Sequence, residues 1–227
     1  MKHLTCADIR TEFRALLDSA TFVKDKSGVD LIEIAGQSFI ADEPSLFGKV
    51  SEEYVARELE WYKSQSLNVN DIPAPVPKIW KAVATPDGRI NSNYGHLIWS
   101  VANYAQYSSC LLQLVKDQAS RRAIMIYTRP SMQAEYNQNG MSDFICTNAV
   151  QYMVRDGRLN AYVQMRSSDA VFGYKNDRAW HQYVLETLAT DLAKHTASVV
   201  IPGNIYWSAT SLHVYARHFD LVLAHEP

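Results

Sequence analysis

Apolar residues at helical spacing predict several amphipathic helices along the chain. Residues 5–17 place Ile9, Phe13 and Leu16 on one helix face behind Thr5, a residue type that often caps helix N-termini. Ser51, with Glu52 and Glu53 after it, predicts a second helix start by the same logic. The helices expected beyond the first span residues 51–65, 103–116 and 178–194.

Alternating apolar and polar residues predict strands between these helices. Two strands are expected around a Ser27-Gly28 turn, within the run TFVKDKSGVDLIEIAGQSFIAD. The clearest hairpin is NAVQYMVRDGRLNAYVQMRS, in which Asp156-Gly157 supplies the turn. Single strands are expected over residues 121–129 and 211–219, and IPAPVP at 72–77 is expected to be a loop. The pattern as a whole predicts a mixed α/β fold around a substantial sheet.

Composition narrows the class of protein without naming a function. The 227 residues, 47% of them hydrophobic and 20% charged, predict one globular domain spanning residues 1–227. A net charge of −2 offers no general positive field for nucleic acid. Charges run through the N-terminal segment and no apolar run reaches about 18 residues, so we expect a cytoplasmic protein without membrane contact.

The three cysteines and seven histidines point away from disulfides and metals. The cysteines are widely spaced and form no C-x-x-C pair, which indicates a reducing compartment. Cys110 falls on an apolar helix stripe and is expected to be a core thiol. His213 and His218, five apart in an expected strand, would face opposite sides, and no HExxH motif occurs, so no metal is expected.

Two residues stand out as candidates for chemistry. Cys146 lies just before the first hairpin strand, at a junction where a side chain can face a cavity, and is either a small buried hydrophobe or a nucleophile. Glu58 lies three residues from Val55 and four from Tyr62 on the apolar helix face, whereas Glu60 falls on the solvated side. An inward carboxylate must be paired, bound to water or functional.

Charged residues lie at the ends of several predicted elements, and the cationic ones suggest an anion site. Arg121 and Arg122 follow Ser120, and Arg166 precedes Ser167, so either pair could bind phosphate or could lie solvated on the surface. Asp177 directly precedes the expected helix 178–194, where it is an N-cap on the simplest interpretation. The residues by themselves therefore predict an anion site and name no substrate.

Long segments carry a resemblance to a known family. They are FVKDKSGVDLIEIAGQSFIADEP, EYVARELEWYKSQSL, PKIW, INSNYGHLIWS, SRRAIMIYTRPSMQAEYNQNGMSDFICTNAVQYMVRDGRLN, MRSSDAVFGYKNDRAW and SLHVYARHF. Together they cover nearly all of residues 22–219 and resemble the thymidylate synthase family, most closely its branch of deoxycytidylate hydroxymethylases in T-even-type phages. The resemblance implies an α/β fold with a large bent mixed sheet flanked by helices, and a homodimer formed through that sheet.

The resemblance also implies which residues bind and attack the nucleotide. Cys146 matches the nucleophile that adds to C6 of the pyrimidine, so that C5 becomes a carbanion-like centre. The implied phosphate ligands are Lys26, Arg121, Arg122, Arg166 and Ser167. Of these, Arg121 and Arg122 match a pair that reaches the phosphate of the other subunit, and Lys26 stands where thymidylate synthases usually have another arginine.

Base and sugar recognition is implied for a further group. Asp169, His213 and Tyr215 match positions around the base and the 3′-hydroxyl. Asp177 matches an asparagine of thymidylate synthases that serves O4 and N3-H of uracil. A carboxyl group can instead accept from the cytosine 4-amino group and, when protonated, donate to N3, so the implied substrate is dCMP.

The implied co-substrate is 5,10-methylenetetrahydrofolate, with Trp80 and Tyr94 lining its cavity. Glu58 is implied to order the water that adds to the exocyclic methylene, which gives 5-hydroxymethyl-dCMP and tetrahydrofolate. The product would enter modified phage DNA in the cytoplasm of the infected host bacterium, where a phage nucleotide-synthesis complex is an implied partner.

Several alternatives remain open on the sequence. A relative could act as a thymidylate synthase, a dUMP hydroxymethylase or a CMP hydroxymethylase. Asp177 argues against the two uracil substrates, whereas the choice between ribose and deoxyribose stays open. A protein of another class, a nucleotide-binding scaffold subunit, would need neither the Cys146 thiol nor the inward Glu58 carboxylate.

Overall fold

The computed structural model describes residues 3–196 and 198–225, and the chain separates into two compact units. Unit 1 is formed by the chain up to residue 50 and from residue 154 onward, and unit 2 by residues 51–153. Unit 2 is therefore an insertion within the chain of unit 1. The single domain expected over residues 1–227 stays a prediction.

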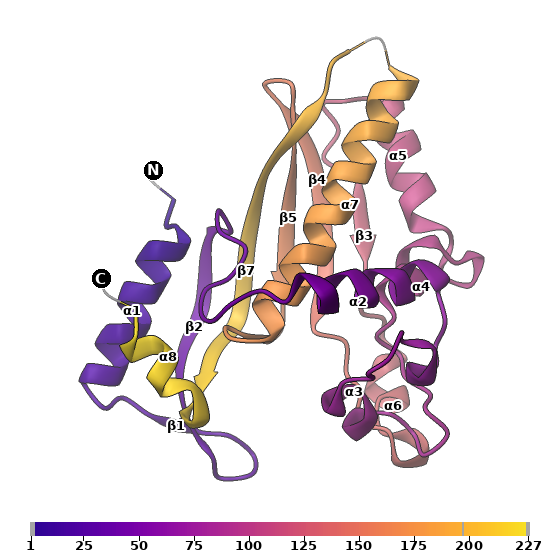
Figure 1. Cartoon of the computed structure of the whole chain (residues 1–227). Helices are drawn as coiled ribbons and strands as arrows, with labels where there is room; N and C mark the ends of the chain where they lie inside the picture. Colours follow the sequence, from indigo (N-terminus) through magenta and orange to yellow (C-terminus); the bar gives the residue numbers. More distant parts are fainter. Residues whose placement is uncertain (1–2, 197, 226–227) are drawn as a thin grey trace. The chain divides into compact units, whose positions relative to one another are not determined.

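Unit 1 combines long strands with one long helix (Figure 1). Its helical segments are α1 (Cys6–Asp18), α7 (Gly173–His195), the 3₁₀ turn η4 (Ala216–His218) and α8 (Phe219–Leu223). Its strands are β1 (Val23–Lys24), β2 (Asp30–Ile40), β5 (Arg158–Met165), β6 (Ser168–Asp169) and β7 (Ile201–Tyr215). Strand β2 pairs antiparallel with β1 and β7, whereas β5 and β6 run parallel to β7. Helix α7 packs on β5 and β7, and α1 packs on β2.

Unit 2 is mainly helical. Its helical segments are α2 (Glu52–Ser64), η1 (Val69–Asp71), α3 (Lys78–Val83), α4 (Tyr94–Trp99), η2 (Val101–Asn103), α5 (Gln106–Lys116), α6 (Met132–Glu135) and η3 (Gln138–Gly140). Strand β3 (Ile124–Ile126) pairs antiparallel with β4 (Thr147–Arg155), which crosses the boundary between the units at Val154. The strand order is β1-β2-β7-β5-β4-β3, with β6 beside β7, so the predicted mixed α/β class with a large sheet is confirmed.

Local capping and turn chemistry explain why several predicted elements form. The Thr5 side chain accepts from the backbone of Asp8, whose carboxylate accepts from the backbone of Thr5, so a capping box opens α1. Ser51 caps α2 as predicted. Asp156 and Gly157 have φ of 51° and 71°, the left-handed pair that a two-residue hairpin turn requires between β4 and β5.

Two predicted elements of unit 2 are shorter than expected. The helix predicted over 103–116 starts at Gln106, because Tyr104 and Ala105 adopt φ of 64° and 43° and cannot continue a right-handed helix. The strand predicted over 121–129 is reduced to β3. Beyond it, the amides of Tyr127 and Thr128 donate to the same carbonyl of Asn148, so the regular ladder stops there.

Two predicted elements of unit 1 have different starts. The helix predicted over 178–194 begins at Gly173, so Asp177 lies in its second turn and the N-cap interpretation is wrong. Tyr174 and Lys175 in the added turn are buried, which extends the packed face beyond the stripe seen in the sequence. The strand predicted over 211–219 is β7, and it ends at Tyr215 because the chain turns into η4. His213 and His218 therefore do not share a strand, and that prediction is wrong.

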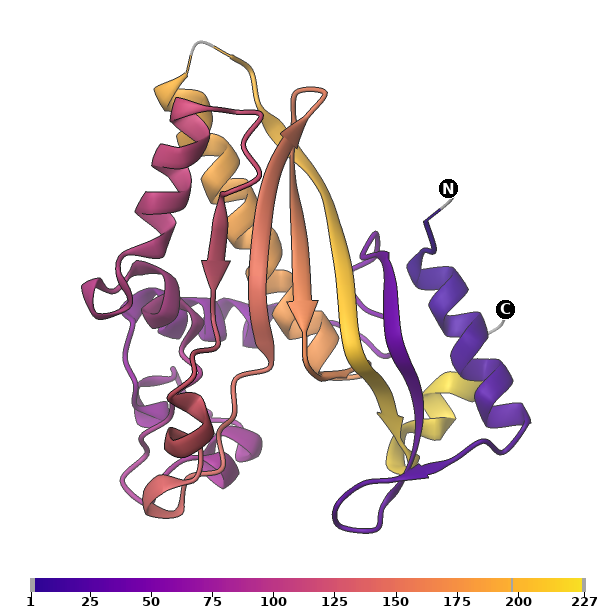
Figure 2. The same ribbon diagram turned by 180° about the vertical axis from the view of Figure 1, so that it is seen from behind.

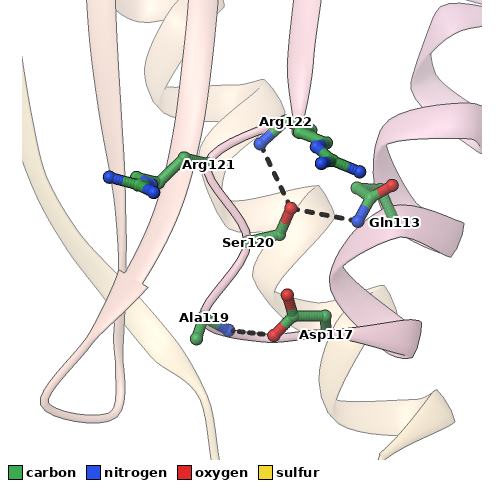
Figure 3. Close-up of a pocket in the computed structure, with 6 residues that line it drawn as sticks. All are labelled: Gln113, Asp117, Ala119, Ser120, Arg121 and Arg122. Carbon is green, nitrogen blue, oxygen red and sulfur yellow. Dashed lines mark hydrogen bonds between the residues drawn. The ribbon is translucent and has the colours of Figure 1, made fainter.

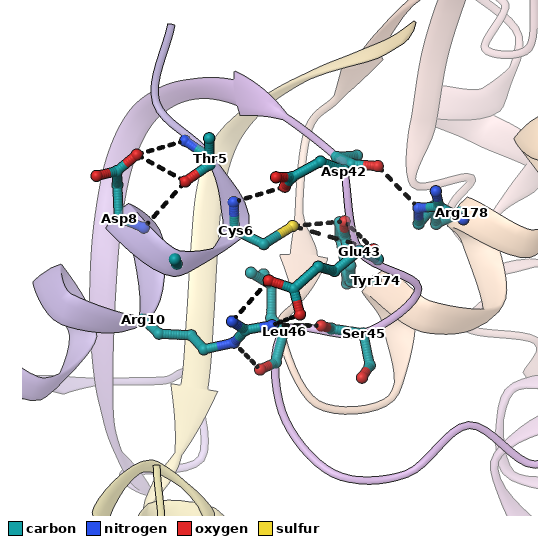
Figure 4. Close-up of polar contacts among 12 residues, drawn as sticks. Thr5, Cys6, Asp8, Arg10, Asp42, Glu43, Ser45, Leu46, Tyr174 and Arg178 are labelled. Carbon is teal, nitrogen blue, oxygen red and sulfur yellow. Dashed lines mark hydrogen bonds and ion pairs between the residues drawn. The ribbon is translucent and has the colours of Figure 1, made fainter. Parts of the chain in front are cut away.

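A polar cluster fastens the loop after β2 to α1 and α7 within unit 1 (Figure 4). The backbone amide of Cys6 donates to Asp42 at 2.9 Å, and the Arg10 guanidinium pairs with the Glu43 carboxylate. Tyr174 donates to the Glu43 carbonyl and Arg178 to the Ala41 carbonyl, both at 2.9 Å. These contacts fix the helix turn that carries Asp177.

One face of strands β5 and β7 in unit 1 is not covered by any helix that the structure describes in this unit (Figure 2). Seen from behind in Figure 2, β5 and β7 lie in front of α7, and no helix from the described part of the unit covers their near face. Tyr162 of β5 and Tyr206 of β7 stack with ring centroids 4.8 Å apart and planes 5° apart, and both are only half-buried. Among the described residues, no helix has the length and apolar character needed to cross a membrane.

Candidate functional site

Glu58 points into unit 2, as predicted, and its carboxyl group is held by two neutral donors. The side chain is 5% exposed, whereas Glu60 on the same helix is exposed. The Tyr54 hydroxyl donates to Glu58 Oε1, and Trp80 Nε1 donates to the same oxygen at 3.1 Å. Burial raises the pKa of Glu58 to about 7, although both hydrogen bonds favour the charged form. A carboxyl group with this pKa can take up or release a proton near neutral pH.

A ladder of aromatic rings leads from Glu58 toward the predicted nucleophile. Trp80 meets Trp61 edge-on at 5.1 Å, and the next ring, Tyr62, stacks on Tyr94 at 5.3 Å. Helix α4 can come this close to α2 because Gly95 has no side chain, since a Cβ there would lie 1.8 Å from the Tyr62 carbonyl oxygen. Unit 2 therefore joins the predicted cavity residues Trp80 and Tyr94 in one packed stack.

The ladder ends at the residue after Cys146. The Thr147 hydroxyl donates to the Tyr94 hydroxyl at 3.2 Å. The loop before Cys146 is fastened by the buried Asp143, whose carboxylate accepts from the amides of Asn91 and Ser92 at 2.7 and 2.8 Å. Cys146 is partly exposed, with Sγ 3.9 Å from the carbonyl oxygen of Phe144. Cys146 thus follows a loop that buried hydrogen bonds hold in place, and the residue is partly accessible.

Arg121 and Arg122 line a surface hollow of about 290 Å³ in unit 2, drawn in Figure 3. The turn is shaped by Ser120, whose hydroxyl oxygen accepts from Gln113 at 3.0 Å and from the amide of Arg122 at 3.1 Å. Both arginine side chains are exposed, and neither makes an ion pair with the residues that the structure describes. The two side chains leave the turn on opposite sides (Figure 3), and each exposed guanidinium group in this state is suited to binding an external anion.

In unit 1, His213 lies between two carboxylates contributed by neighbouring strands. It is opposite Glu33 of β2 and opposite Asp169 of β6, and its side chain is buried. Burial lowers the pKa of His213, an effect that Asp169 and Glu33 oppose and Arg166 reinforces. The ring of Tyr215 meets it edge-on at 5.1 Å. Unit 1 thus brings together the predicted group of Arg166, Asp169, His213 and Tyr215.

The other predicted residues of unit 1 lie near this group in the chain. Ser167 is half-buried and joins Arg166 to β6. Asp177 is half-buried on α7, and one of its carboxylate oxygens is 3.8 Å from the place a Cβ of Gly173 would occupy. Lys26 is exposed in the loop between β1 and β2, which Asp25 shapes by accepting from the amides of Ser27 and Val29.

Sequence reasoning missed some supporting residues. Tyr54 is four residues before Glu58, so its place on the same helix face was a usable signal. Asp143, in contrast, bonds to residues about fifty positions away, and no local pattern announces such a contact. Among the described residues, no group of three or more His, Cys, Asp or Glu side chains could hold a metal ion.

Comparison with known proteins identifies the family behind this arrangement. A family model described as thymidylate synthase matches residues 13–225. The chain belongs to the thymidylate synthase family. Deoxycytidylate 5-hydroxymethyltransferases of Enterobacteria phages T4 and T2 are each 56% identical to it over 220 residues, which cover 96% of this chain and 89% of the relative. The enzyme of the same name from Enterobacteria phage T6 is equally similar.

Membership of the thymidylate synthase family confirms the resemblance found in the sequence. The match extends on both sides of residues 22–219, the span that carried the resemblance. Enzymes of the thymidylate synthase family transfer a one-carbon unit from methylenetetrahydrofolate. The relatives are transferases by name, and they cover nearly the whole chain, so both units of the structure have counterparts in them.

Proposed function

We propose that this protein is a deoxycytidylate 5-hydroxymethyltransferase. In the proposed reaction dCMP, 5,10-methylenetetrahydrofolate and water give 5-hydroxymethyl-dCMP and tetrahydrofolate. The observation that carries the proposal is the 56% identity to the T4 enzyme of that name over 96% of the chain. It is supported by Glu58, a buried acid–base group with a pKa near 7, because adding water across a double bond needs a proton acceptor.

Cys146 is the proposed nucleophile. Its thiolate adds to C6 of the cytosine ring, so that a C–S bond forms and electron density collects at C5. After C5 has taken the one-carbon unit, loss of the C5 proton would break the bond between that carbon and the folate nitrogen, so that tetrahydrofolate leaves and an exocyclic methylene remains. Glu58 then orders a water molecule for addition to this methylene. Expulsion of the thiolate then restores the aromatic base. The hydrogen bonds of Asp143 in the loop before Cys146, and the partial exposure of Cys146, support this role.

The co-substrate supplies the one-carbon unit when it is bound. The residues of unit 2 fit a flat heteroaromatic ring, because Trp80 is only half-buried at the end of the aromatic ladder. Trp80 and Tyr94 are the proposed wall of this site, and Glu58 lies directly beside Trp80.

The nucleotide phosphate is proposed to meet cationic residues from two copies of the chain. Lys26, Arg166 and Ser167 would bind it within one subunit, and Arg121 and Arg122 would reach it from the other. Arg121 and Arg122 are exposed and make no ion pair with any residue that the structure describes, which supports this arrangement, since a dianionic phosphate would supply the opposite charge. The uncovered face of β5 and β7, with its half-buried Tyr162 and Tyr206, is the proposed dimer surface.

Base and sugar recognition is assigned to the group in unit 1. Asp169, His213 and Tyr215 are proposed to surround the base and the 3′-hydroxyl, and Asp177 to select cytosine. In the cell, the enzyme would work in the cytoplasm of the infected host bacterium, beside other enzymes of a phage nucleotide-synthesis complex, and supply modified phage DNA.

The decisive experiment weighs the products. Purified protein is incubated with tetrahydrofolate, formaldehyde and, separately, dCMP, CMP and dUMP, and the nucleotides are analysed by mass spectrometry. We expect a gain of CH₂O on dCMP alone, and none with Cys146→Ser, which should still bind dCMP. A gain of CH₂ on dUMP with dihydrofolate formed would indicate a thymidylate synthase instead. No product from any nucleotide would favour the scaffold alternative.

Substrate choice tests Asp177 separately. The Asp177→Asn variant is expected to shift the ratio of kcat/KM for dCMP over dUMP toward dUMP by at least about tenfold, because an amide can serve O4 and N3-H of uracil. Competition between the two nucleotides in one reaction measures the ratio directly. An unchanged ratio would mean that another residue reads the base.

A further inference from the structure

Tyr54 forms a closed ring of hydrogen bonds with Glu58 and Trp80. It lies one helical turn before Glu58 on α2, so the two side chains share a helix face. Its hydroxyl donates to Glu58 Oε1 and accepts from Trp80 Nε1 at 3.1 Å, while Trp80 Nε1 also reaches Glu58 Oε1 at 3.1 Å. The ring therefore joins helix α2 to helix α3 through polar atoms.

The Tyr54 ring is itself held in place from the side. The Arg57 guanidinium carbon is 5.8 Å from the centroid of the Tyr54 ring. Arg57 also donates to the carbonyls of Pro73 and Pro75 at 3.2 and 2.9 Å, and these belong to the loop that leads into α3. The same helix turn thus fixes both the tyrosine and the approach to Trp80.

The two oxygens of the Glu58 carboxyl group have different surroundings. Oε1 accepts from both Tyr54 and Trp80, whereas Oε2 accepts from no residue in the described part of the chain. An oxygen that already accepts two hydrogen bonds is a poor place for a further proton. Oε2 is therefore the oxygen that carries the exchangeable proton and that can meet a water molecule.

No neighbouring charge competes with this arrangement among the described residues. Arg57 is turned toward Glu53, 3.8 Å away, and Lys78 and Lys81 of α3 are exposed. On α4, burial lowers the pKa of His96, and Tyr94 packs against Tyr62. Burial and the two hydrogen bonds are accordingly what set the ionisation of Glu58.

We propose that Tyr54 is a positioning residue that, together with Trp80, occupies Glu58 Oε1 and leaves Oε2 to exchange the proton in the hydration step. This inference rests on the proposed function for its kinetic consequence and adds a residue to that reaction. Tyr54 touches neither substrate nor water in this role, and it acts through the orientation and the proton affinity of Glu58.

The test replaces Tyr54 by phenylalanine and follows kcat for hydroxymethylation of dCMP between pH 5 and 9.5. Losing a hydrogen bond to the carboxylate raises its pKa, so the acidic limb of the profile, expected near pH 7, should move up by about one unit. Turnover should fall about fivefold at pH 7 and return close to the wild-type value at pH 9. Tyr104→Phe, at a highly exposed tyrosine of the same unit, is the matched control and should not move the limb.

A merely structural role for Tyr54 would lower kcat equally at every pH, and that result would overturn the proposal.

A direct readout keeps the test independent of the proposed function. The indole N–H signal of Trp80, assigned with Trp80→Phe, should titrate with Glu58 in the wild type and about one unit higher in Tyr54→Phe. It should not titrate in Glu58→Gln. If wild type makes no product while this titration shifts, the proposed function fails and the positioning by Tyr54 stands. If the titration does not shift, the positioning fails.

Should Tyr54→Phe fold poorly, Trp80→Phe removes the other donor to Oε1. The carbon resonance of the Glu58 carboxyl group should then titrate at higher pH than in the wild type. An unchanged titration in that variant would contradict the idea that donors to Oε1 control the proton on Oε2.

Discussion

Unit 2 and unit 1 each bury titratable groups, and burial shifts the pKa values of these groups in opposite directions. In unit 2, burial raises the pKa of Glu58 to about 7 and favours its neutral, protonated form. In unit 1, burial lowers the pKa of His181 to about 3 and also lowers that of His213, so both imidazoles are neutral at pH 7. In both units burial favours the uncharged form of these groups. For a carboxyl group that form is the protonated one, and for an imidazole it is the deprotonated one.

The difference shows what each environment is suited to do. Glu58 is surrounded by neutral donors only, so its pKa comes to lie where a carboxyl group can exchange protons at physiological pH. His213 has carboxylates on two sides that partly offset the effect of its burial, but its pKa stays below the ordinary value, so the neutral imidazole is favoured at neutral pH. The proposed proton transfer is therefore assigned to unit 2, and recognition of the base and the sugar to unit 1.

The largest expected effect is on turnover after Glu58→Gln. The amide keeps the size of the side chain and cannot accept a proton, so kcat for hydroxymethyl-dCMP should fall about a hundred- to ten-thousandfold. Binding of dCMP, followed by calorimetry, should stay within about twofold, since Glu58 is not among the residues proposed to bind the nucleotide. Glu60→Gln, at the exposed neighbour on the same helix, is the matched control and should retain full activity.

The comparison between the units would break down if both glutamine variants were equally active. It would also break down if Glu58→Gln abolished dCMP binding along with turnover, because Glu58 would then serve recognition. Mass spectrometry of the product separates these outcomes from a change in the reaction itself.

The fold was predictable where local chemistry decides. Thr5 and Ser51 mark helix starts, and Asp156-Gly157 marks a hairpin, because capping and left-handed turns depend on neighbouring residues. Element ends set by distant contacts were not predictable. The first turn of α7 is packed because Tyr174 bonds to the Glu43 carbonyl, 131 positions away. That contact moves the helix start and takes Asp177 out of the cap position.

The candidate site shows the same division. The inward direction of Glu58 follows from helix periodicity, and the structure confirms it. Its pKa near 7 does not follow from sequence, because it depends on Trp80, which reaches it from another helix. The division of the predicted residues between two units could not be seen in a linear chain either. Roles such as that of Cys146 came from family resemblance and stay predictions.

The next largest effect concerns the acid stability of unit 1. The pKa of His181 is about 3 in the folded protein and 6.5 in the unfolded chain. Between these two pH values the imidazole binds a proton only when the protein is unfolded. Stability is therefore lost as pH falls below 6.5. The free energy of unfolding should therefore fall by about 3 kcal/mol less between pH 7 and pH 4 in His181→Met than in the wild type. Urea unfolding of both proteins at the two pH values measures this difference. The matched control is His195→Gln, at an exposed histidine of the same helix, and an equal change in both variants would rule out this origin.

The smallest effect, of opposite sign, is expected in unit 2. The pKa of Glu58 is about 7 in the folded protein and 4.5 when unfolded, so the folded state holds the proton longer as pH rises. Stability is thus lost with rising pH, by about 2 kcal/mol between pH 5 and pH 7. The glutamine of Glu58→Gln cannot ionise, so this variant should lack the loss. Its free energy of unfolding should therefore rise relative to that of the wild type as pH increases. Urea unfolding at pH 5, 6 and 7 measures the gain, with Glu60→Gln in parallel. A constant difference between Glu58→Gln and wild type would mean that Glu58 ionises freely in the folded protein, and the contrast between the two units would rest on His181 and His213 alone.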